Sequence, residues 1–203
     1  MNNRTIVVVL AAALVVAGCA TGSGSDAEVV QTLKASFKAR GIAKLDRLDQ
    51  SELQRECSVY AEDPMPKPLA EKLEKAAMAT VKYPADGKYL GDWKKGESIA
   101  QTGRGLQYSD SANTVNGGNC YACHQIDKNE MSYGNIGPSL RNYGKARGTA
   151  EPILKYTWAK IWNAHAFTAC SQMPRFGDAG ILTEGQMKDV MALLLDPASP
   201  NNQ

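Results

Sequence analysis

The stretch that decides the fold is Cys120-Tyr121-Ala122-Cys123-His124. A Cys-x-x-Cys-His run predicts covalent attachment of a c-type haem. Two thiols about one helical turn apart can add to the two haem vinyl groups as thioethers, and the imidazole that follows can then reach the iron from one face. We therefore expect Cys120 and Cys123 to hold one haem c and His124 to be an axial ligand of its iron.

Two other interpretations of the cysteine pair fit the sequence less well. A thioredoxin-like redox disulfide would belong to a βαβ pattern, and no such pattern surrounds the motif. A zinc site would need a second pair of ligands, and the only other histidine of the chain is His165. Haem attachment is the interpretation that we carry forward.

The second axial ligand is expected to be Met173, in the stretch Gln172-Met173-Pro174. Pro174 disfavours helical backbone at Met173 and so indicates an extended loop. Thioether ligation would raise the reduction potential of the haem. Methionine is more often a core residue than a ligand, and His165 is an alternative ligand that would give a bis-histidine site. The Cys170 thiolate is a further alternative.

Gly137-Pro138 follows the haem motif by one loop. In small c-type cytochromes a proline carbonyl at this place accepts the Nδ1–H of the proximal imidazole, which fixes the orientation of the ring. Pro138 is the candidate here, and the alternative is a proline that serves only a turn.

Residues 1–18 are predicted to be a lipoprotein signal peptide. Arg4 supplies a positive start, and residues 6–16 form an uncharged apolar run that is too short to span a bilayer comfortably. The run ends in Val16-Ala17-Gly18-Cys19, so Cys19 is expected to become the acylated first residue of the mature chain. An ordinary signal peptide that happens to end near a cysteine is the alternative.

The predicted location of the protein is the periplasm, where a lipid anchor would hold it to the membrane. Residues 19–25 form a lipidated tether of small residues. Ala20 stands where an aspartate would retain a lipoprotein at the inner membrane, which favours the outer membrane.

Cys57 and Cys170 remain after Cys19 and the two haem cysteines are assigned, because the chain has five cysteines. Disulfides persist in exported proteins, so we expect a Cys57–Cys170 disulfide that ties the N-terminal part of the chain to the haem domain. A free thiol, a ligating thiol or a bond to a partner chain is the alternative.

Hydrophobic periodicity predicts an all-α fold. Together with the haem motif, it indicates a haem domain at residues 89–203 that is similar to a class I cytochrome c, with an additional N-terminal helical extension at residues 26–88. No strand-rich segment interrupts it. In the extension, helices are expected over 26–57, broken at Gly41, and over 69–81. In the haem domain they are expected over 91–103 (capped by Asp92), over 151–166 and after Thr183, with residues 127–149 as a loop.

The charge balance argues against a nucleic-acid partner. The chain has 23 Lys and Arg against 21 Asp and Glu, with no basic stripe. Nucleic-acid-binding proteins show a stronger basic bias.

Several stretches together resemble SoxX, the mono-haem cytochrome c subunit of the SoxAX complex of bacterial thiosulfate oxidation. They are the Gly118-Asn119 lead-in to the haem motif, the Gly137-Pro138-Ser139-Leu140 loop, Met173-Pro174-Arg175-Phe176-Gly177, and the closing Leu193-Leu194-Leu195-Asp196-Pro197. The resemblance covers roughly residues 90–200 and implies His124 and Met173 as the iron ligands.

The resemblance also implies partners and a function. A SoxA-like cytochrome subunit would couple thiosulfate oxidatively to a cysteine of a SoxYZ-like carrier protein, as an L-cysteine S-thiosulfotransferase. This chain would accept the electrons and pass them to a downstream cytochrome c. The alternatives are a free-standing lipid-anchored mono-haem shuttle with no enzyme partner, or a peroxidase-like haem enzyme, which would need an open sixth position.

Overall fold

The computed structural model describes residues 26–203. The predicted signal peptide (1–18), the tether (19–25) and the acylation site Cys19 lie outside the described residues. The chain divides into two units, one ending at Lys38 and the other comprising Ala39–Gln203, and each is described by itself.

The described part of the first unit is helix α2 (Asp26–Ser36) and the two residues after it. Asp26 and Glu28 lie in its first turn and Lys34 in its last, an order that suits the helix dipole. Its apolar side chains are exposed, and no residue of the helix is buried.

The second unit is built from helices and short 3-10 turns. Its α-helices are α3 (Glu52–Val59), α4 (Lys67–Ala79), α5 (Trp93–Gln101), α6 (Tyr143–Arg147), α7 (Glu151–Trp162) and α8 (Glu184–Leu195). Its 3-10 turns are η2 (Leu45–Leu48), η3 (Cys120–Ala122), η4 (Ala164–Ala166) and η5 (Pro200–Asn202). Within residues 26–203 there is no β-strand, only an isolated bridge between Arg40 and Ala43, so the all-α prediction is confirmed.

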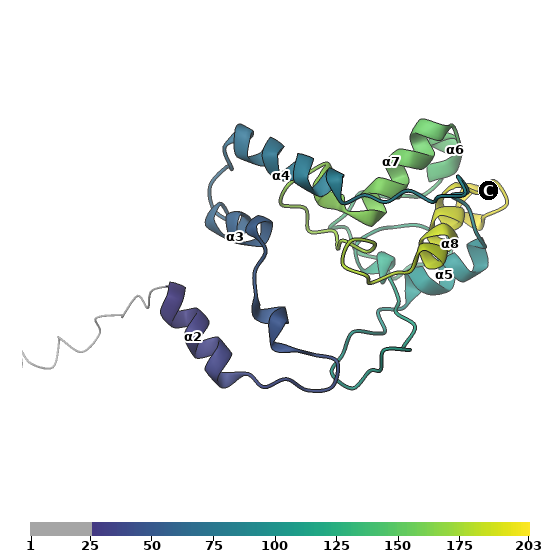
Figure 1. The fold of residues 1–203 in the computed structure, drawn as a ribbon. Coiled ribbons are helices and arrows are strands. Elements are labelled where there is room, and N and C mark those ends of the chain that lie inside the picture. Colours follow the sequence, from purple (N-terminus) through teal and green to yellow (C-terminus); the bar gives the residue numbers. More distant parts are fainter. Residues whose placement is uncertain (1–25) are drawn as a thin grey trace, which may run out of the picture. The chain divides into compact units, whose positions relative to one another are not determined.

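Helices α5 and α8 pack side by side (Figure 1). Gly96 lies at their close approach, because a Cβ at this position would overlap the backbone carbonyl of Asp189. The start of α5 is joined to α8 by the amide of Asp92, which donates to the Asp189 carboxylate at 2.8 Å. This pair of helices forms one wall of the core.

Helix α7 contributes the largest core side chain. Trp158 is fully buried, and its Nε1 donates to the carbonyl of Lys82 at 2.8 Å. The Trp158 and Tyr89 rings pack edge to face, with their centroids 5.8 Å apart. From α8 the core receives Met187, Val190, Met191, Leu193, Leu194 and Leu195.

Most predicted helices are present, with shifted ends. The caps expected at Asp92 and Thr183 are formed, and the Thr183 cap is a full capping box with Gln186. The helix expected up to residue 166 ends at Trp162, where Asn163 leaves helical geometry and caps the η4 turn.

The extension departs further from the sequence pattern. Gly41, at φ 55°, sits in a turn as expected, but the stretch after it is not one helix. It forms the η2 turn, and α3 begins afresh at a capping box between Ser51 and Gln54. A polar cap thus overrides the apolar spacing that favoured a continuous helix.

The C-terminus holds the loop that follows the haem motif. The side-chain amide of buried Asn201 donates to the Leu140 carbonyl at 3.1 Å. The backbone carbonyl of Asn201 accepts from the Asn142 amide at 3.0 Å. Asn202 accepts from the Lys145 amide at 3.1 Å. These bonds support the short helix α6, which lies inside the segment predicted to be a loop.

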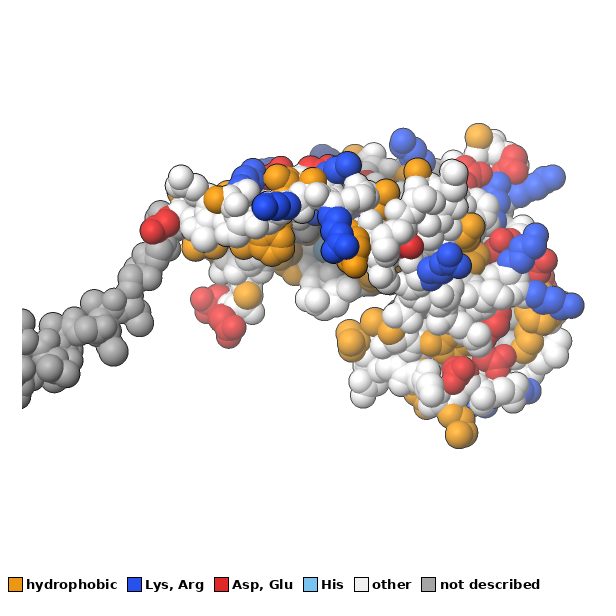
Figure 2. All heavy atoms as spheres, turned by 90° about the horizontal axis from the view of Figure 1, so that it is seen from below, with side chains coloured by type: hydrophobic (Ala, Val, Ile, Leu, Met, Phe, Trp, Pro, Cys, Tyr) orange, Lys and Arg blue, Asp and Glu red, His pale blue; other side chains and the backbone are white. Residues whose placement is uncertain are grey.

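The surface mixes side chains of both charges. Lys and Arg side chains alternate with Asp and Glu on the face drawn in Figure 2, and hydrophobic side chains reach this surface at several separate places. No helix in the described part of the chain combines the length and apolar character needed to cross a bilayer.

Candidate haem site

The two haem-motif cysteines project from a single tight turn. In η3 the amides of Cys123 and His124 both donate to the Cys120 carbonyl, at 3.1 and 2.9 Å. Within residues 26–203, Cys120 and Cys123 are the cysteines without a disulfide. Two unbonded thiols on one turn, followed directly by an imidazole, fit thioether attachment of a haem.

The turn is fastened to the end of α5. The Gly118 amide donates to the Ile99 carbonyl at 2.8 Å, and the Asn119 amide donates to the Thr102 carbonyl at 2.9 Å. A Cβ at Gly117 would overlap the Thr102 carbonyl, so the backbone can approach α5 only with glycine at this position. The glycines before the motif therefore set where the cysteines lie.

Burial raises the pKa of the Cys120 thiol to about 12. A thiolate at this position is therefore strongly disfavoured, whereas a neutral thioether carries no charge to desolvate. The surroundings of Cys120 suit the attached form.

The His124 ring is oriented by the loop that follows the motif. Its Nδ1 lies 2.7 Å from the Pro138 carbonyl oxygen, so Nδ1–H is the donor and Nε2 carries the free lone pair. A Cβ at Gly137 would overlap the imidazole, so the ring packs directly on this glycine. Both observations match what an iron ligand at Nε2 requires.

Tyr121 ties the motif to α5 through a polar contact. Its hydroxyl lies 3.0 Å from both carboxylate oxygens of Glu97 and accepts from the Asp127 amide at 3.1 Å. Burial raises the pKa of both Glu97 and Tyr121. No sequence pattern indicated this pair, because Glu97 is far from the motif along the chain.

Met173 packs against the hydrophobic cluster that also receives Cys120. It is half-buried, and its amide donates to the Ser171 hydroxyl at 3.2 Å. The chain then turns around Trp162, whose carbonyl accepts from the amides of Gly177 and Asp178 at 3.1 Å. The structure thus brings the predicted sixth ligand and an attachment cysteine to the same cluster.

Trp162 was not among the residues singled out from the sequence. Its Nε1 is buried and has no hydrogen-bond partner among the described residues. A buried indole N–H normally finds an acceptor. A haem propionate oxygen would supply one, so this orphaned donor fits a bound haem.

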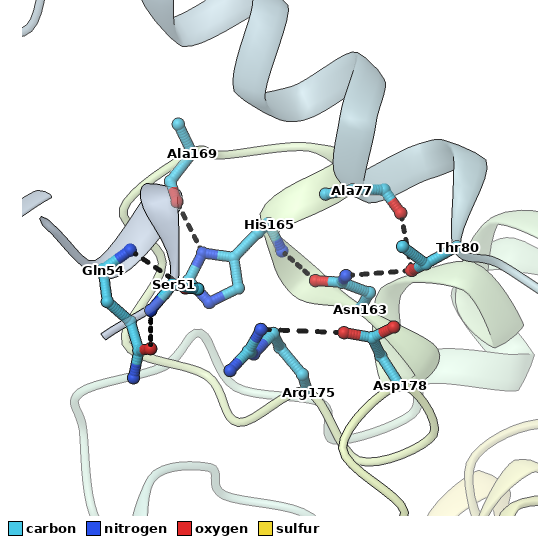
Figure 3. Close-up of polar contacts among 9 residues, drawn as sticks. All are labelled: Ser51, Gln54, Ala77, Thr80, Asn163, His165, Ala169, Arg175 and Asp178. Atoms are coloured by element: carbon cyan, nitrogen blue, oxygen red, sulfur yellow. Dashed lines mark hydrogen bonds and ion pairs between the residues drawn. The ribbon is translucent and has the colours of Figure 1, made fainter. Parts of the chain in front are cut away.

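Of the two alternative ligands, Cys170 is engaged in a disulfide, whereas the bond that His165 makes through Nδ1 leaves its Nε2 free. The Nδ1 of His165 lies 2.5 Å from the Ala169 carbonyl oxygen (Figure 3). Cys170 is bonded to Cys57 with an S–S distance of 2.07 Å, which is the pairing expected from the sequence and leaves no thiolate for iron. Close by, Arg175 pairs with Asp178 at 3.6 Å (Figure 3).

Comparison with known proteins agrees with this geometry. The cytochrome c family model matches residues 94–196, about half of the chain. An uncharacterized lipoprotein of Aquifex aeolicus (strain VF5) is 44% identical over 131 residues, which cover 64% of this chain and 61% of that protein. The match therefore spans less than two thirds of the relative's length. The chain belongs to the cytochrome c family: it is an all-α protein with a covalently bound haem c.

Proposed function

We propose that Cys120 and Cys123 carry the thioether links, and that His124 and Met173 are the axial ligands of the haem iron. The bound haem supplies an iron that accepts and releases one electron. The Pro138 carbonyl holds the imidazole so that Nε2 would be the atom that ligates the iron, and the Met173 sulfur would be the second ligand. The observation that carries this proposal is the His124–Pro138 bond at 2.7 Å, which orients a ligating ring.

We further propose that the chain is the electron-accepting subunit of a SoxAX-type L-cysteine S-thiosulfotransferase. Three stretches that resemble SoxX are in contact with the proposed haem site: Gly118-Asn119 at the end of α5, Gly137-Pro138 on the His124 ring, and the Met173 stretch on the core cluster. In this assignment the sulfur chemistry takes place on a SoxA-like subunit, which joins thiosulfate to a SoxYZ-like carrier cysteine. This chain receives the electrons and passes them to a downstream cytochrome c.

An apolar edge beside the haem motif supports a protein partner. Met131 is 89% exposed and Ile136 is 72% exposed, on the loop whose Gly134 and Gly137 amides donate to the carbonyls of Tyr121 and Cys123. Exposed apolar side chains next to a redox group suit transient docking. We propose that a partner cytochrome docks on this loop.

We propose that the mature chain is anchored to the periplasmic face of the outer membrane through acylated Cys19. The relative from Aquifex aeolicus carries the name lipoprotein, which supports an anchor here. In this proposal residues 1–18 are removed, residues 19–25 are the tether, residues 26–88 form the extension and residues 89–203 form the haem domain. Replacing Cys19 by Ala should move the protein from the membrane fraction to the soluble periplasmic fraction.

The same relative gives weight to a second candidate function, a free-standing lipid-anchored shuttle without an enzyme partner. Purification of the full protein from native membranes separates the two functions. A stable complex with a second haem protein, in which thiosulfate and the carrier protein reduce this haem, supports the thiosulfotransferase. If the protein is a monomer and its haem stays oxidised when thiosulfate and the carrier protein are added, the shuttle is supported.

A further inference from the structure

The segment that leads into Met173 is held by elements outside the part of the chain that matches the cytochrome c family. That match covers residues 94–196, whereas α3 and α4 lie at residues 52–79. Both helices nevertheless bond to the residues just before Met173. This arrangement points to a task for the N-terminal extension.

Helix α3 is joined to the segment by a covalent bond. Cys57 lies within α3, and its disulfide partner Cys170 comes three residues before Met173. The Cys57 sulfur also lies 3.7 Å from the Ala169 carbonyl oxygen.

Helix α4 is joined to the same segment by a carboxylate. The Ala169 amide donates to Glu74 Oε1 at 3.1 Å. The carbonyl of this same residue lies 2.5 Å from His165 Nδ1, and Figure 3 shows the ring facing it. Ala169 is thus fixed through its amide by α4 and through its carbonyl by the turn after α7.

The disulfide spans a gap rather than reinforcing a packed core. An open pocket of about 640 Å³ lies between α3 and the segment, lined by Leu53, Gln54 and Cys57 on one side and by His165, Cys170 and Gln172 on the other. Cys57 and Cys170 both line this pocket, so the disulfide joins its two sides.

We propose that the Cys57–Cys170 disulfide and Glu74 are positioning groups for the Met173 ligand. They hold residues 169–172 so that the methionine sulfur stays at the iron. This inference rests on the proposed ligation by Met173. A segment anchored at Cys170 and Ala169 opens rarely, whereas an unanchored segment would open by local unfolding.

The experiment uses the full-length ferric holoprotein and cyanide, an anion that binds haem iron only when the sixth position opens. Cys57→Ser/Cys170→Ser should bind cyanide roughly tenfold faster and show a weaker methionine-to-iron charge-transfer band, since 1.4 kcal/mol of lost local stability raises the open population tenfold. Glu74→Ala should show a smaller change in the same direction. Glu74→Gln should behave as wild type, because its amide oxygen can still accept from Ala169.

The control variant is Lys72→Ala. It breaks the Lys72–Glu52 ion pair, 2.7 Å long, which joins α4 to α3 without touching residues 169–172. Its cyanide rate should equal that of wild type. A general loosening of the extension would instead speed cyanide binding in Lys72→Ala as well, and that outcome overturns the proposal.

Failure of the proposal is distinguishable from failure of the ligation. If Met173→Ala abolishes the charge-transfer band while the double serine variant leaves band and cyanide rate unchanged, Met173 is the ligand and the disulfide does not position it. If Met173→Ala keeps the band, the ligation itself is wrong. If the double serine variant does not fold, the test is the rate of cyanide binding in Glu74→Ala compared with that in Glu74→Gln. Equal rates in the two variants would reject the role of Glu74.

Discussion

The two sides of the proposed haem site are built in different ways. On the attachment side, the bonds that place His124 come from its own neighbourhood, chiefly Gly118 on the end of α5 and the Pro138 carbonyl. On the Met173 side, local bonds to Ser171 and Ala169 are joined by two long-range bonds, from Cys57 and Glu74, about a hundred residues earlier. The first side is encoded in a contiguous motif and the second in the tertiary fold, so damage to the two sides should have separable consequences.

The largest expected effect is on the attachment side. Replacing Cys120 and Cys123 together by Ala should abolish covalent haem, because no other thiol of the unit is unbonded. Haem staining after denaturing electrophoresis measures this. The Cys57→Ser/Cys170→Ser protein should stain as wild type does, and haem that stays on the Cys120/Cys123 variant after denaturation would contradict the assignment.

The next largest effect is expected on global stability, when the Cys57–Cys170 disulfide is removed. The disulfide joins residues separated by 113 positions, so its removal should lower the free energy of unfolding by ~3–5 kcal/mol. Urea denaturation followed by far-UV circular dichroism measures this. A loss below ~1 kcal/mol would show that α3 stays docked without the bond, and would weaken the contrast between the two sides.

Trp162 lies on the Met173 side, where its carbonyl accepts from the Gly177 and Asp178 amides, and its unpaired Nε1 tests whether the haem supplies the missing acceptor. If its Nε1 donates to a propionate, Trp162→Phe should cost the holoprotein ~1.5–3 kcal/mol, the range for a bond to a charged group. The reference is Trp158→Phe, which loses a hydrogen bond to the neutral Lys82 carbonyl. The loss of that bond should lower the free energy of unfolding by ~0.5–1.5 kcal/mol. A Trp162→Phe holoprotein as stable as wild type would mean that the indole donor has no partner even with haem bound.

The smallest expected effect is the pH dependence due to Glu97, beside Tyr121. Burial raises the pKa of Glu97 in the folded state above its ordinary value of 4.5, so folding takes up a proton there. The contribution of Glu97 to stability therefore falls as pH rises from the ordinary to the raised pKa. Because solvent screens this half-buried group, the change should stay below ~1 kcal/mol.

Glu97→Gln should lack this component, so its stability relative to wild type should increase across that pH interval. Thermal unfolding of both proteins at several pH values measures the difference. A difference that is constant with pH would show that Glu97 titrates in the folded protein as it does in the unfolded chain.

Much of the attachment side was predictable because its signals are local. Asp92 and Thr183 identify the starts of α5 and α8, and the spacing of Cys120, Cys123 and His124 identifies the cofactor. The Cys57–Cys170 pairing followed from counting the cysteines. Each of these inferences needs only neighbouring residues or composition.

What the sequence did not reveal depends on contacts between distant residues. Helix α6 is held by Asn201 and Asn202, and neither asparagine carries a pattern that points to its partner. The bond from Ala169 to Glu74 and the unpaired Nε1 of Trp162 likewise exist only once the helices are packed. The capping box at Ser51 and Gln54 was a local signal that the apolar periodicity obscured.

The most direct test of the central claim, a haem held by His124 and Met173, is the proton NMR spectrum of the reduced, diamagnetic holoprotein. A methionine methyl group bound to the iron lies over the haem ring, whose ring current shifts its resonance far upfield. We predict one such methyl resonance, present in wild type and absent in Met173→Ala. A wild-type spectrum without it would contradict methionine ligation, and its persistence in Met173→Ala would assign the ligand to another methionine.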